Sequence, residues 1–336
     1  MLEQLVKRRY WWFVLSLVMI LPGLYFLLLH PLITTGQPRF GLRPSIDFSG
    51  GALWEVRFAE RAPGELGSSE VGAAFAAAGF DNAQVQMSQV DLDGTPIVTA
   101  LVRTRPLNEQ TPLQDRQAVE AALNEQIGAA AIERLESVGP TVSQESTRSA
   151  VLAVVGASLM ILLYLTWAFR KAPHPVRYGM CAIISMVHDV VIIIGVAAIF
   201  STFNPRFEVD ALFLTALLTI LSFSVHDTIV VFDRVRENLL ARQPDQEFGD
   251  LVNHSIVQTL PRSINTQMTT FFTLTALLFF GGETIQNFVL ILLIGLIVGT
   301  YSSIFNAAQI LVVWEHREWK NWFGRGRRDH EKPATV

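Results

Sequence analysis

Two aspartates lie inside long apolar runs of this chain, and each directly follows a histidine. They are Asp189, after His188 in the run Tyr178–Phe203, and Asp227, after His226 in the run Ala211–Phe232. A carboxylate near the middle of a bilayer is costly unless it is neutralised, paired or hydrated, and by default it marks a path for ions or protons. The pattern therefore predicts a membrane protein that moves protons or couples their movement to another process.

Asp227 is the first candidate for proton coupling. A carboxyl group held between burial and a nearby cation can change its protonation state as its surroundings move. Arg262, which directly precedes the later apolar run Ser263–Gly282, is the candidate cation. The structural alternative pairs Asp227 with a neighbouring helix and lets the long side chain of Arg262 extend to the membrane interface.

Asp189 and the two histidines complete the candidate set. His188 and His226 can bind or release a proton near neutral pH. Adjacent residues of a helix project about 100° apart, so we do not expect either histidine to share a face with its own aspartate. Each histidine either takes part in proton transfer or satisfies a neighbouring polar group, and the sequence leaves both interpretations open.

The elements that must position these residues are six runs, each long enough for the roughly 20 apolar residues that span a membrane. The runs are Tyr10–Leu29, Ser149–Phe169, Tyr178–Phe203, Ala211–Phe232, Ser263–Gly282 and Thr284–Trp314. The first run could instead be a signal peptide, for which an apolar core of about 7–15 residues and a small-residue cleavage site are typical. Because His30-Pro31-Leu32-Ile33 follows it, we predict an uncleaved helix.

Composition agrees with a membrane protein and argues against several enzyme classes. Of the 336 residues, 50% are apolar and only 17% are charged. The single cysteine, Cys181, allows no disulfide within one chain and no cysteine metal site. The histidines lack metal-ligand spacing, and the sequence contains no G-x-x-x-x-G-K-S/T phosphate loop. We expect no catalytic residues, enzyme activity, cofactor, bound metal or nucleic-acid partner.

Positive charges divide the links between the runs into two sets. The basic set comprises Lys7, Arg8, Arg9, Arg170, Lys171, Arg177, Arg234, Arg236, Arg242, Arg262, Arg317, Lys320, Arg325, Arg327 and Arg328. The opposite short links, Ser201–Asp210 and the turn at Gly282-Glu283, contain only Arg206. The positive-inside rule then places both termini in the cytosol. We therefore divide the chain into residues 1–30 (cytosolic N-terminus and first helix), 31–147 (external domain), 148–314 (the later helices with their cytosolic links) and 315–336 (basic cytosolic tail).

The external segment has the composition of a separate water-soluble domain. Alternating residues predict strands, and glycine-terminated polar stretches predict helices. In chain order these are Ala52–Phe58, helix Ser68–Ala78, Asn82–Val90, a turn at Asp91-Leu92-Asp93-Gly94, Ile97–Thr104, helix Thr111–Ile127 and Ala130–Val138. The order β-α-β-β-α-β is the ferredoxin-like split repeat. The expected fold class is an α-helical polytopic membrane protein with an α+β ferredoxin-like extracytoplasmic domain. The ferredoxin-like fold occurs in proteins of many functions, so it does not indicate one by itself.

Three further features concern packing and the membrane surface. Gly295-x-x-x-Gly299 has the small-residue spacing that lets two helices approach closely. Glu237–Pro261 mixes apolar and polar residues, and we predict either an amphipathic helix on the membrane surface or a plain connector helix. The basic and aromatic tail is expected to anchor at membrane lipids.

Several motifs resemble the SecD and SecF protein-export family, and in combination they resemble SecF. They are Asp47-Phe48-Ser49-Gly50-Gly51, His188-Asp189-Val190, the run Ser224–Asn238, Asn253-x-Ser255-x-x-Gln258-Thr259-Leu260-x-Arg262-Ser263-x-Asn265-Thr266, Gly281-Gly282 and Gly299-Thr300-x-Ser302-Ser303-Ile304. The first motif would mark the junction between the first helix and the external domain. The chain has His226 and Phe223 where the family usually has Asn and Tyr.

The resemblance implies an accessory subunit of the general secretion machinery, with the helical fold of the RND superfamily. It implies SecD as a partner, action with the SecYEG channel on translocating preproteins, and use of protons in the bacterial cytoplasmic (inner) membrane. Asp227 and Arg262 match the intramembrane acid and base of the family, and Asp189 matches the acid of its third helix.

Two other functions remain open at this point. An RND-type exporter of small molecules or lipids would share intramembrane carboxylates, but it ordinarily needs more helices and larger external domains than this chain offers. A non-catalytic scaffold would only stabilise a partner, and charge substitutions in its third to fifth helices would be inert.

Overall fold

The computed structural model describes residues 4–59, 61–62, 64–92, 95–204, 207–243 and 245–318. The chain divides into two compact units. The helical unit comprises Met1–Leu42, Val154–Phe207 and Leu212–Val336, and the sheet unit comprises Arg43–Ala153 and Glu208–Ala211. The predicted turn residues Asp93 and Gly94, Arg206, and the tail from Trp319 onward lie outside the described residues.

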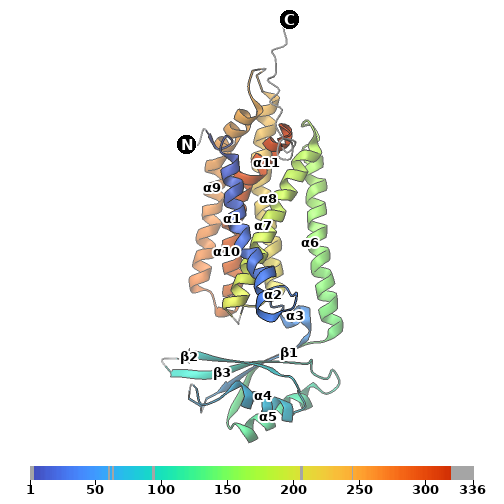
Figure 1. Cartoon of the computed structure of the whole chain (residues 1–336), viewed down its shortest axis with the longest axis vertical. Coiled ribbons are helices and arrows are strands. Elements are labelled where there is room, and N and C mark those ends of the chain that lie inside the picture. Colours follow the sequence, from blue (N-terminus) through green and yellow to red (C-terminus); the bar gives the residue numbers. More distant parts are fainter. Residues whose placement is uncertain are drawn as a thin grey trace. The chain divides into compact units, whose positions relative to one another are not determined.

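Long helices form the helical unit (Figure 1). The first rod is continuous through α1 (Arg9–Leu24), the π-helical turn η2 (Tyr25–Leu29) and α2 (His30–Thr35). The later elements are α6 (Pro140–Ala168), α7 (Pro175–Phe203), α8 (Ala211–Leu240), α9 (Phe248–Phe280), α10 (Glu283–Ser302), the π-helical turn η3 (Ser303–Ala307) and α11 (Ala308–Glu315).

Five stretches of the described chain are long and apolar enough to cross a membrane. They are Arg9–Thr35, Pro140–Ala168, Pro175–Phe203, Ala211–Leu240 and Ile285–Glu315. The predicted run Ser263–Gly282 lies almost entirely in α9, which does not reach this hydropathy, because Asn265, Gln267 and several threonines interrupt its apolar residues. The fold is therefore mostly helical with five candidate membrane spans.

The first rod is longer than the predicted run Tyr10–Leu29. Pro31 lacks a backbone N–H, and it lies in the first turn of α2, where that donor is not needed. The π-helical turn just before it closes with the N–H of His30 bonded to the carbonyl of Tyr25. This wider turn lets the helix continue past the proline until Gly36, whose φ of 68° ends it.

The predicted surface or connector helix at Glu237–Pro261 is not a separate element. α8 continues to Leu240, and α9 begins at Phe248 and runs through Pro261 into the predicted membrane run. The apolar residues at the start of α9, such as Leu251 and Ile256, are fully buried in the hydrophobic core of the helical unit. The interpretation as a membrane-surface helix was wrong, because this apolar face packs against protein.

The sheet unit has one four-stranded antiparallel sheet in the order β2-β3-β1-β4. Its elements are α3 (Ile46–Ser49), β1 (Gly51–Phe58), α4 (Ser68–Ala77), β2 (Gln84–Leu92), β3 (Thr95–Thr104), α5 (Pro112–Gln126) and β4 (Ala130–Val138). From β1 onward, the elements follow the predicted order β-α-β-β-α-β. α4 and α5 lie on one face of the sheet (Figure 1).

The core of the sheet unit follows from the alternation of β1. Ala52, Trp54, Val56 and Phe58 are at most 1% exposed, while the residues between them are half-buried. The Trp54 ring meets Phe75 and Phe80 edge to face, and its indole N–H donates to Thr104 Oγ1 at 2.9 Å. Because each large apolar side chain buried in this way contributes about 1.5–3 kcal/mol, the pattern fixes which face of the sheet the helices cover.

Glycines allow close helix contacts in the helical unit. A side chain at Gly295 of α10 would collide with Ile220 of α8, and a Cβ at Gly299 would lie 3.1 Å from Ser224 Cβ. Gly23 and Gly195 make a comparable contact between α1 and α7, where a Cβ on Gly23 would lie 2.7 Å from Gly195 Cα. The small-residue motif of α10 therefore lies where this helix meets α8.

Candidate functional site

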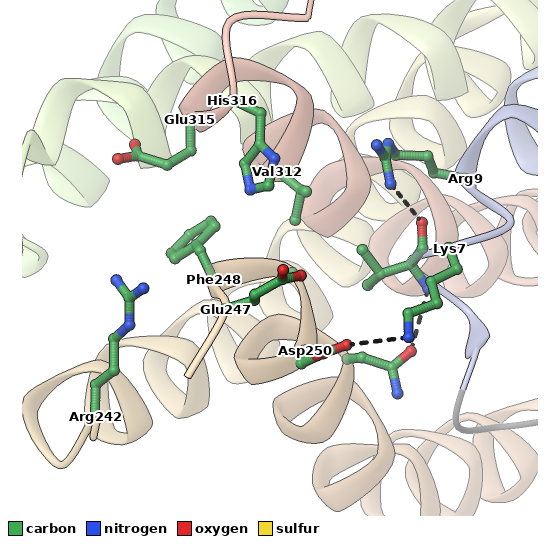
Figure 2. Close-up of a pocket in the computed structure, with 12 residues that line it drawn as sticks. Lys7, Arg9, Arg242, Glu247, Phe248, Asp250, Val312, Glu315 and His316 are labelled. Carbon is green, nitrogen blue, oxygen red and sulfur yellow. Dashed lines mark hydrogen bonds and ion pairs between the residues drawn. The ribbon is translucent and has the colours of Figure 1, made fainter. Parts of the chain in front are cut away.

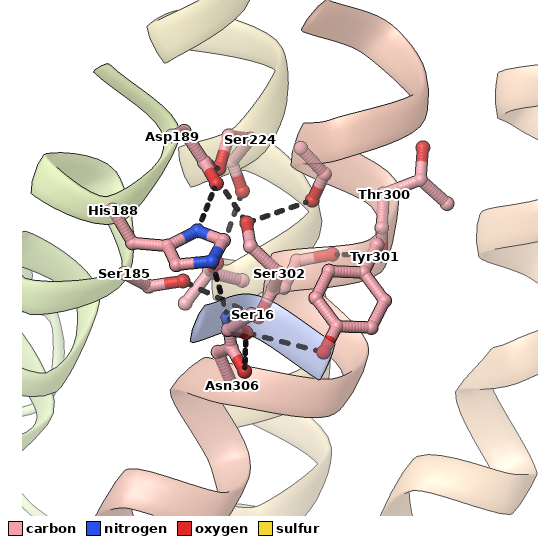
Figure 3. Close-up of polar contacts among 12 residues, drawn as sticks. Ser16, Ser185, His188, Asp189, Ser224, Thr300, Tyr301, Ser302 and Asn306 are labelled. Atoms are coloured by element: carbon pink, nitrogen blue, oxygen red, sulfur yellow. Dashed lines mark hydrogen bonds and ion pairs between the residues drawn. The ribbon is translucent and has the colours of Figure 1, made fainter. Parts of the chain in front are cut away.

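Asp189 is fully buried in the helical unit, where three side chains contact its carboxylate (Figure 3). Its Oδ2 accepts hydrogen bonds from Ser224 Oγ of α8 at 2.5 Å and from Ser302 Oγ of α10 at 2.7 Å. Its Oδ1 lies 2.9 Å from His188 Nδ1. Both oxygens are therefore engaged, and the carboxylate joins α7, α8 and α10.

His188 contacts its own neighbour Asp189, which contradicts the prediction that they would not share a face. The Cβ directions do diverge, but the imidazole is long enough to turn back toward the carboxylate of the adjacent residue. Its Nε2 lies 3.2 Å from Asn306 Nδ2. With Nδ1 protonated toward the carboxylate, Nε2 can accept from the Asn306 amide.

The contacts of His188 continue into a polar cluster that reaches α1 (Figure 3). Asn306 lies in η3, and its amide exchanges hydrogen bonds with Ser16 Oγ at 2.9 and 3.0 Å. Ser16 Oγ lies 3.1 Å from the hydroxyl of Tyr301, which donates to the carbonyl of Trp12 at 2.6 Å. The cluster is centred on a π-helical turn, an element that occurs often at functional sites.

Asp227 of α8 is also buried, with 2% exposure, but its surroundings are much simpler. Its Oδ2 accepts one hydrogen bond, from Gln267 Nε2 of α9 at 2.5 Å. The other amide atom, Gln267 Oε1, is buried and has no hydrogen-bond partner among the described residues. Asp227 lies three positions after Ser224, so the two aspartates are connected through less than one turn of α8.

Arg262 is not the partner of Asp227 in this structure. Its side chain is exposed, and it forms no ion pair within the described part of the chain. Arg262 precedes Gln267 by five positions on α9, which places it about 140° around the helix from the side chain that contacts Asp227. His226 is exposed as well, so the second His-Asp pair differs from the first.

The signature Asp47-Phe48-Ser49-Gly50-Gly51 lies in the sheet unit at the start of β1. Ser45 caps α3, and Asp47 Oδ2 accepts from the backbone N–H of Ala211 at 3.2 Å. Gly50 and Gly51 have φ values of 70° and 119°, and a Cβ at Gly51 would lie 2.8 Å from the carbonyl of Thr104. Only glycine adopts this backbone without strain, so the paired glycines and the half-buried Phe48 form a tight corner.

Further contacts hold the segment Glu208–Ala211, which leads into α8, to the rest of the sheet unit. Glu208 forms an ion pair with Arg103 of β3, and Val209 makes a parallel bridge with Pro44. Burial raises the pKa of the Glu208 carboxyl, although the positive charge of Arg103 acts in the opposite direction. The link between α7 and α8 is thus tied to the junction motif within the sheet unit.

Two cavities bear on the candidate site, both lined by described residues of the helical unit. One, of about 600 Å3, lies where the N-terminal segment meets α9 and α11, and charges of both signs line it, including Lys7, Asp250 and Glu315 (Figure 2). The other, of about 400 Å3 and mostly apolar, is bounded by α9, α10 and η3 and includes Gln267 and Tyr301. Of these two cavities, the second includes described residues of the aspartate sites, because Gln267 contacts Asp227 and Tyr301 belongs to the polar cluster around His188.

Comparison with known proteins places this arrangement in a family. Residues 118–317 match the family described as "Protein export membrane protein SecD/SecF, C-terminal". The chain is 45% identical to the protein translocase subunit SecF of Thermobaculum terrenum over 96% of both chains. It is 44% identical to that of Anaerolinea thermophila over 99% of both chains.

The chain belongs to the SecF family. SecF proteins are subunits of the protein translocase, and this chain has an accessory role in the Sec machinery for protein transport. It is also 33% identical, over 82% of its length, to the SecDF protein of Thermus thermophilus. The crystal structure of SecDF, a translocon-associated membrane protein from the same genus, matches with a TM-score of 0.71 and 30% identity. The match covers 93% of this chain and 38% of the SecDF chain.

The contacts reveal site residues that the sequence did not single out for this role. They are Ser16, Ser224, Gln267, Tyr301, Ser302 and Asn306. Gln267 and Asn306 carry amides that apolar helices seldom contain without a partner, and the three serines are of a type enriched where membrane helices pack closely. That signal was available in the sequence, but only the packing shows which of them meet which aspartate.

Proposed function

We propose that this chain is a proton-coupled SecF subunit. With SecD and the SecYEG channel, it promotes preprotein translocation across the bacterial cytoplasmic membrane. The observation that carries the proposal is the environment of Asp227. This carboxyl is 2% exposed, contacts the neutral amide of Gln267, and has no ion pair among the described residues. The SecDF relative, whose name joins both subunits, supports SecD as the partner.

A carboxyl group in this position can act as a switch. Its two protonation states differ by a full charge in surroundings where charge is costly, so proton uptake or release changes which helix arrangement is favoured. One proton that moves down a potential of 100 mV releases about 2.3 kcal/mol. That energy suffices to shift an equilibrium between arrangements that differ by a few kcal/mol.

The proposal includes α9 as a sixth membrane span. The hydroxyls of Thr266, Thr269, Thr270 and Thr273 each donate to the carbonyl four residues earlier in the same helix. Such bonds satisfy polar groups without water, so these threonines are compatible with lipid. Gln267 faces Asp227 instead of lipid. This assignment would bring the total to six spans.

The same proposal places the sheet unit outside as a ferredoxin-like domain and both termini in the cytosol, because positive charges are concentrated in the termini and in the links after the second and fourth predicted spans. A single cysteine at Arg116, in a Cys181→Ala background, tests the topology with an impermeant thiol reagent. Labelling in intact cells is expected, and labelling only after lysis would refute the topology. The excised domain should show a strand signal by circular dichroism.

The decisive functional test substitutes Asp227 with Asn. This change removes the proton site with nearly the same shape, so the complex should assemble while the gradient-stimulated part of preprotein translocation is lost. Asp233→Asn is the matched control, because it makes the same chemical change at an exposed position of α8. Normal gradient stimulation in an assembled Asp227→Asn complex would exclude proton coupling at Asp227 and leave a scaffold role.

A further inference from the structure

The buried face of α9 carries a line of polar side chains that ends at Asp227. They are Ser255, Thr259, Ser263 and Gln267, with exposures of 0, 8, 2 and 7%. A spacing of four residues puts them on one face, about 6 Å apart along the axis. We call these four residues the α9 polar stripe.

Two contacts fix what the α9 polar stripe faces. At one end Gln267 Nε2 donates to Asp227, and at the other end Asn238 Nδ2 donates to Ser255 Oγ at 2.8 Å. Asp227 and Asn238 both lie on α8, in the opposite chain order, so α8 and α9 are antiparallel along this contact. Ser263 and Thr259 therefore lie between the two contacts.

Two atoms of the α9 polar stripe need partners that the described residues do not supply. Ser263 Oγ and Gln267 Oε1 are buried without a hydrogen bond. Thr259 Oγ1, in contrast, donates to the carbonyls of Ser255 and Ile256, both at 3.1 Å. Buried polar atoms without a protein partner are normally satisfied by internal water. The stripe is thus unsatisfied at the two positions nearest Asp227.

The far end of the stripe reaches the exposed surface of the helical unit. Asn238 Nδ2 also donates to Gln258 Oε1 at 3.0 Å, and Arg234 Nε donates to the same oxygen at 2.6 Å. Gln258 is exposed, as is Leu240, where α8 ends. A polar group therefore lies at each level between the exposed link that joins α8 to α9 and the buried carboxyl of Asp227.

We propose that the α9 polar stripe holds a file of water molecules and is the half-path by which Asp227 exchanges protons with the side of the α8–α9 link. The proton-transfer role of this file rests on the proposed function, whereas the presence of water along the stripe does not. A proton that enters at the Asn238 end is passed from one water to the next, and the last water gives a proton to the Asp227 carboxylate. Each water gives up one proton as it gains another, so only Asp227 changes charge. Ser263 and Gln267 are positioning residues that hold the file.

Water access is tested with cysteines in a Cys181→Ala background of the full chain. Membranes opened to both sides are treated with a small, charged methanethiosulfonate reagent, so the result does not depend on topology. Ser263→Cys is compared with Ile256→Cys, which is equally buried on the same helix, lies nearer the exposed link and is off the stripe. Ser263→Cys should react several-fold faster. Equal or slower reaction at position 263 would overturn the proposal.

Thr259→Cys guards against a folding defect at position 263, because it lies on the stripe one turn nearer the link. It should also react faster than Ile256→Cys, and failure to do so would overturn the file. Labelling is independent of export. If the cysteines react but Asp227→Asn leaves gradient stimulation intact, the water file stands and the proposed function fails.

The role of the file in proton exchange is tested with Ser263→Val and Ser263→Thr. Valine has nearly the same shape as threonine but no hydroxyl, so the two variants differ only in that group. In Ser263→Val, gradient-stimulated translocation should fall several-fold and its solvent deuterium isotope effect should rise, because proton delivery becomes rate-limiting. Threonine keeps the hydroxyl and should restore both values. A purely structural defect would slow translocation without raising the isotope effect, and that result would contradict the assigned role of Ser263.

Discussion

Asp189 and Asp227 lie in the same helical unit, are buried to the same degree and are joined through α8, yet their environments differ. Asp189 contacts two hydroxyls and one imidazole through both oxygens. Asp227 accepts from one amide, next to polar atoms that have no partner among the described residues. A saturated carboxylate is held in one state by its donors, whereas a sparsely bonded one can change state at lower cost. We infer that Asp189 organises the helices and that Asp227 carries the exchangeable proton.

The largest expected effect is on the stability of Asp189→Asn, whereas Asp227→Asn should mainly affect proton coupling. Asp189→Asn leaves the donors of Ser224, Ser302 and His188 with a weaker acceptor, so we expect about 3 kcal/mol of destabilisation. Asp227→Asn disturbs one hydrogen bond and should cost about 1 kcal/mol or less, although it removes gradient stimulation. Thermal unfolding of the purified complex in lipid, with translocation measured in parallel, checks both. Equal loss of stability in the two variants would show that the contacts of Asp189 hold the fold no more strongly than the single contact of Asp227.

A smaller effect is expected at Arg262. It is exposed and five positions from Gln267, so it does not hold the Asp227 carboxylate in the observed arrangement. If the helices rearrange during transport, its positive charge matters more than its planar shape. Gradient-stimulated translocation should therefore fall more in Arg262→Met than in Arg262→Lys. Wild-type rates in Arg262→Met would exclude any part for this charge in coupling.

The smallest effect concerns Glu318, far along the chain from either aspartate. Partial burial opposes its charge, but hydrogen bonds from Arg9 and Tyr10, together with the charge of Arg9, lower the pKa of Glu318 below its ordinary value. A lowered pKa means that this contact stabilises the fold above the unfolded pKa and is lost as the pH falls through the folded pKa.

Glu318→Gln should therefore be less stable than the wild type near neutral pH. The difference in thermal midpoint between the two proteins should become smaller as the pH falls into the acid range. The measurement is the thermal midpoint of both proteins between neutral pH and about pH 3, a window that brackets the ordinary glutamate value. A difference that stays constant over this range would show that the Arg9 contact contributes nothing. Gradient-stimulated translocation near neutral pH should not change, unlike in Asp227→Asn.

Local patterns in the sequence predicted much of this fold. The alternation in Ala52–Phe58 gave β1 almost to the residue, because one buried face imposes a period of two. The prediction placed β4 at Ala130–Val138, as observed. The ends of α1, α8 and α9 were missed, because an apolar run marks where a helix would cross a membrane and not where the helix ends. α8 continues to the exposed Leu240, and α9 begins well before Pro261 and runs through it.

The candidate site was only partly predictable. Asp189 and Asp227 stand out in the sequence because charge is rare in apolar helices. Their partners do not, because Ser302 and Gln267 reach the aspartates only through tertiary packing. Arg262 was expected to contact Asp227 because it directly precedes the run Ser263–Gly282. In the structure its side chain points away from the face of α9 that carries Gln267, so it does not meet Asp227.

Infrared difference spectroscopy of the carboxyl C=O stretch can show which of the two aspartates exchanges its proton. The purified complex in lipid is stepped between two pH values, and the bands that gain or lose a proton are assigned with the two Asn variants. If Asp227 carries the exchangeable proton, a carboxyl band will be absent in Asp227→Asn and present in Asp189→Asn. A band that persists in Asp227→Asn and disappears in Asp189→Asn would show that the exchangeable proton lies on the other aspartate.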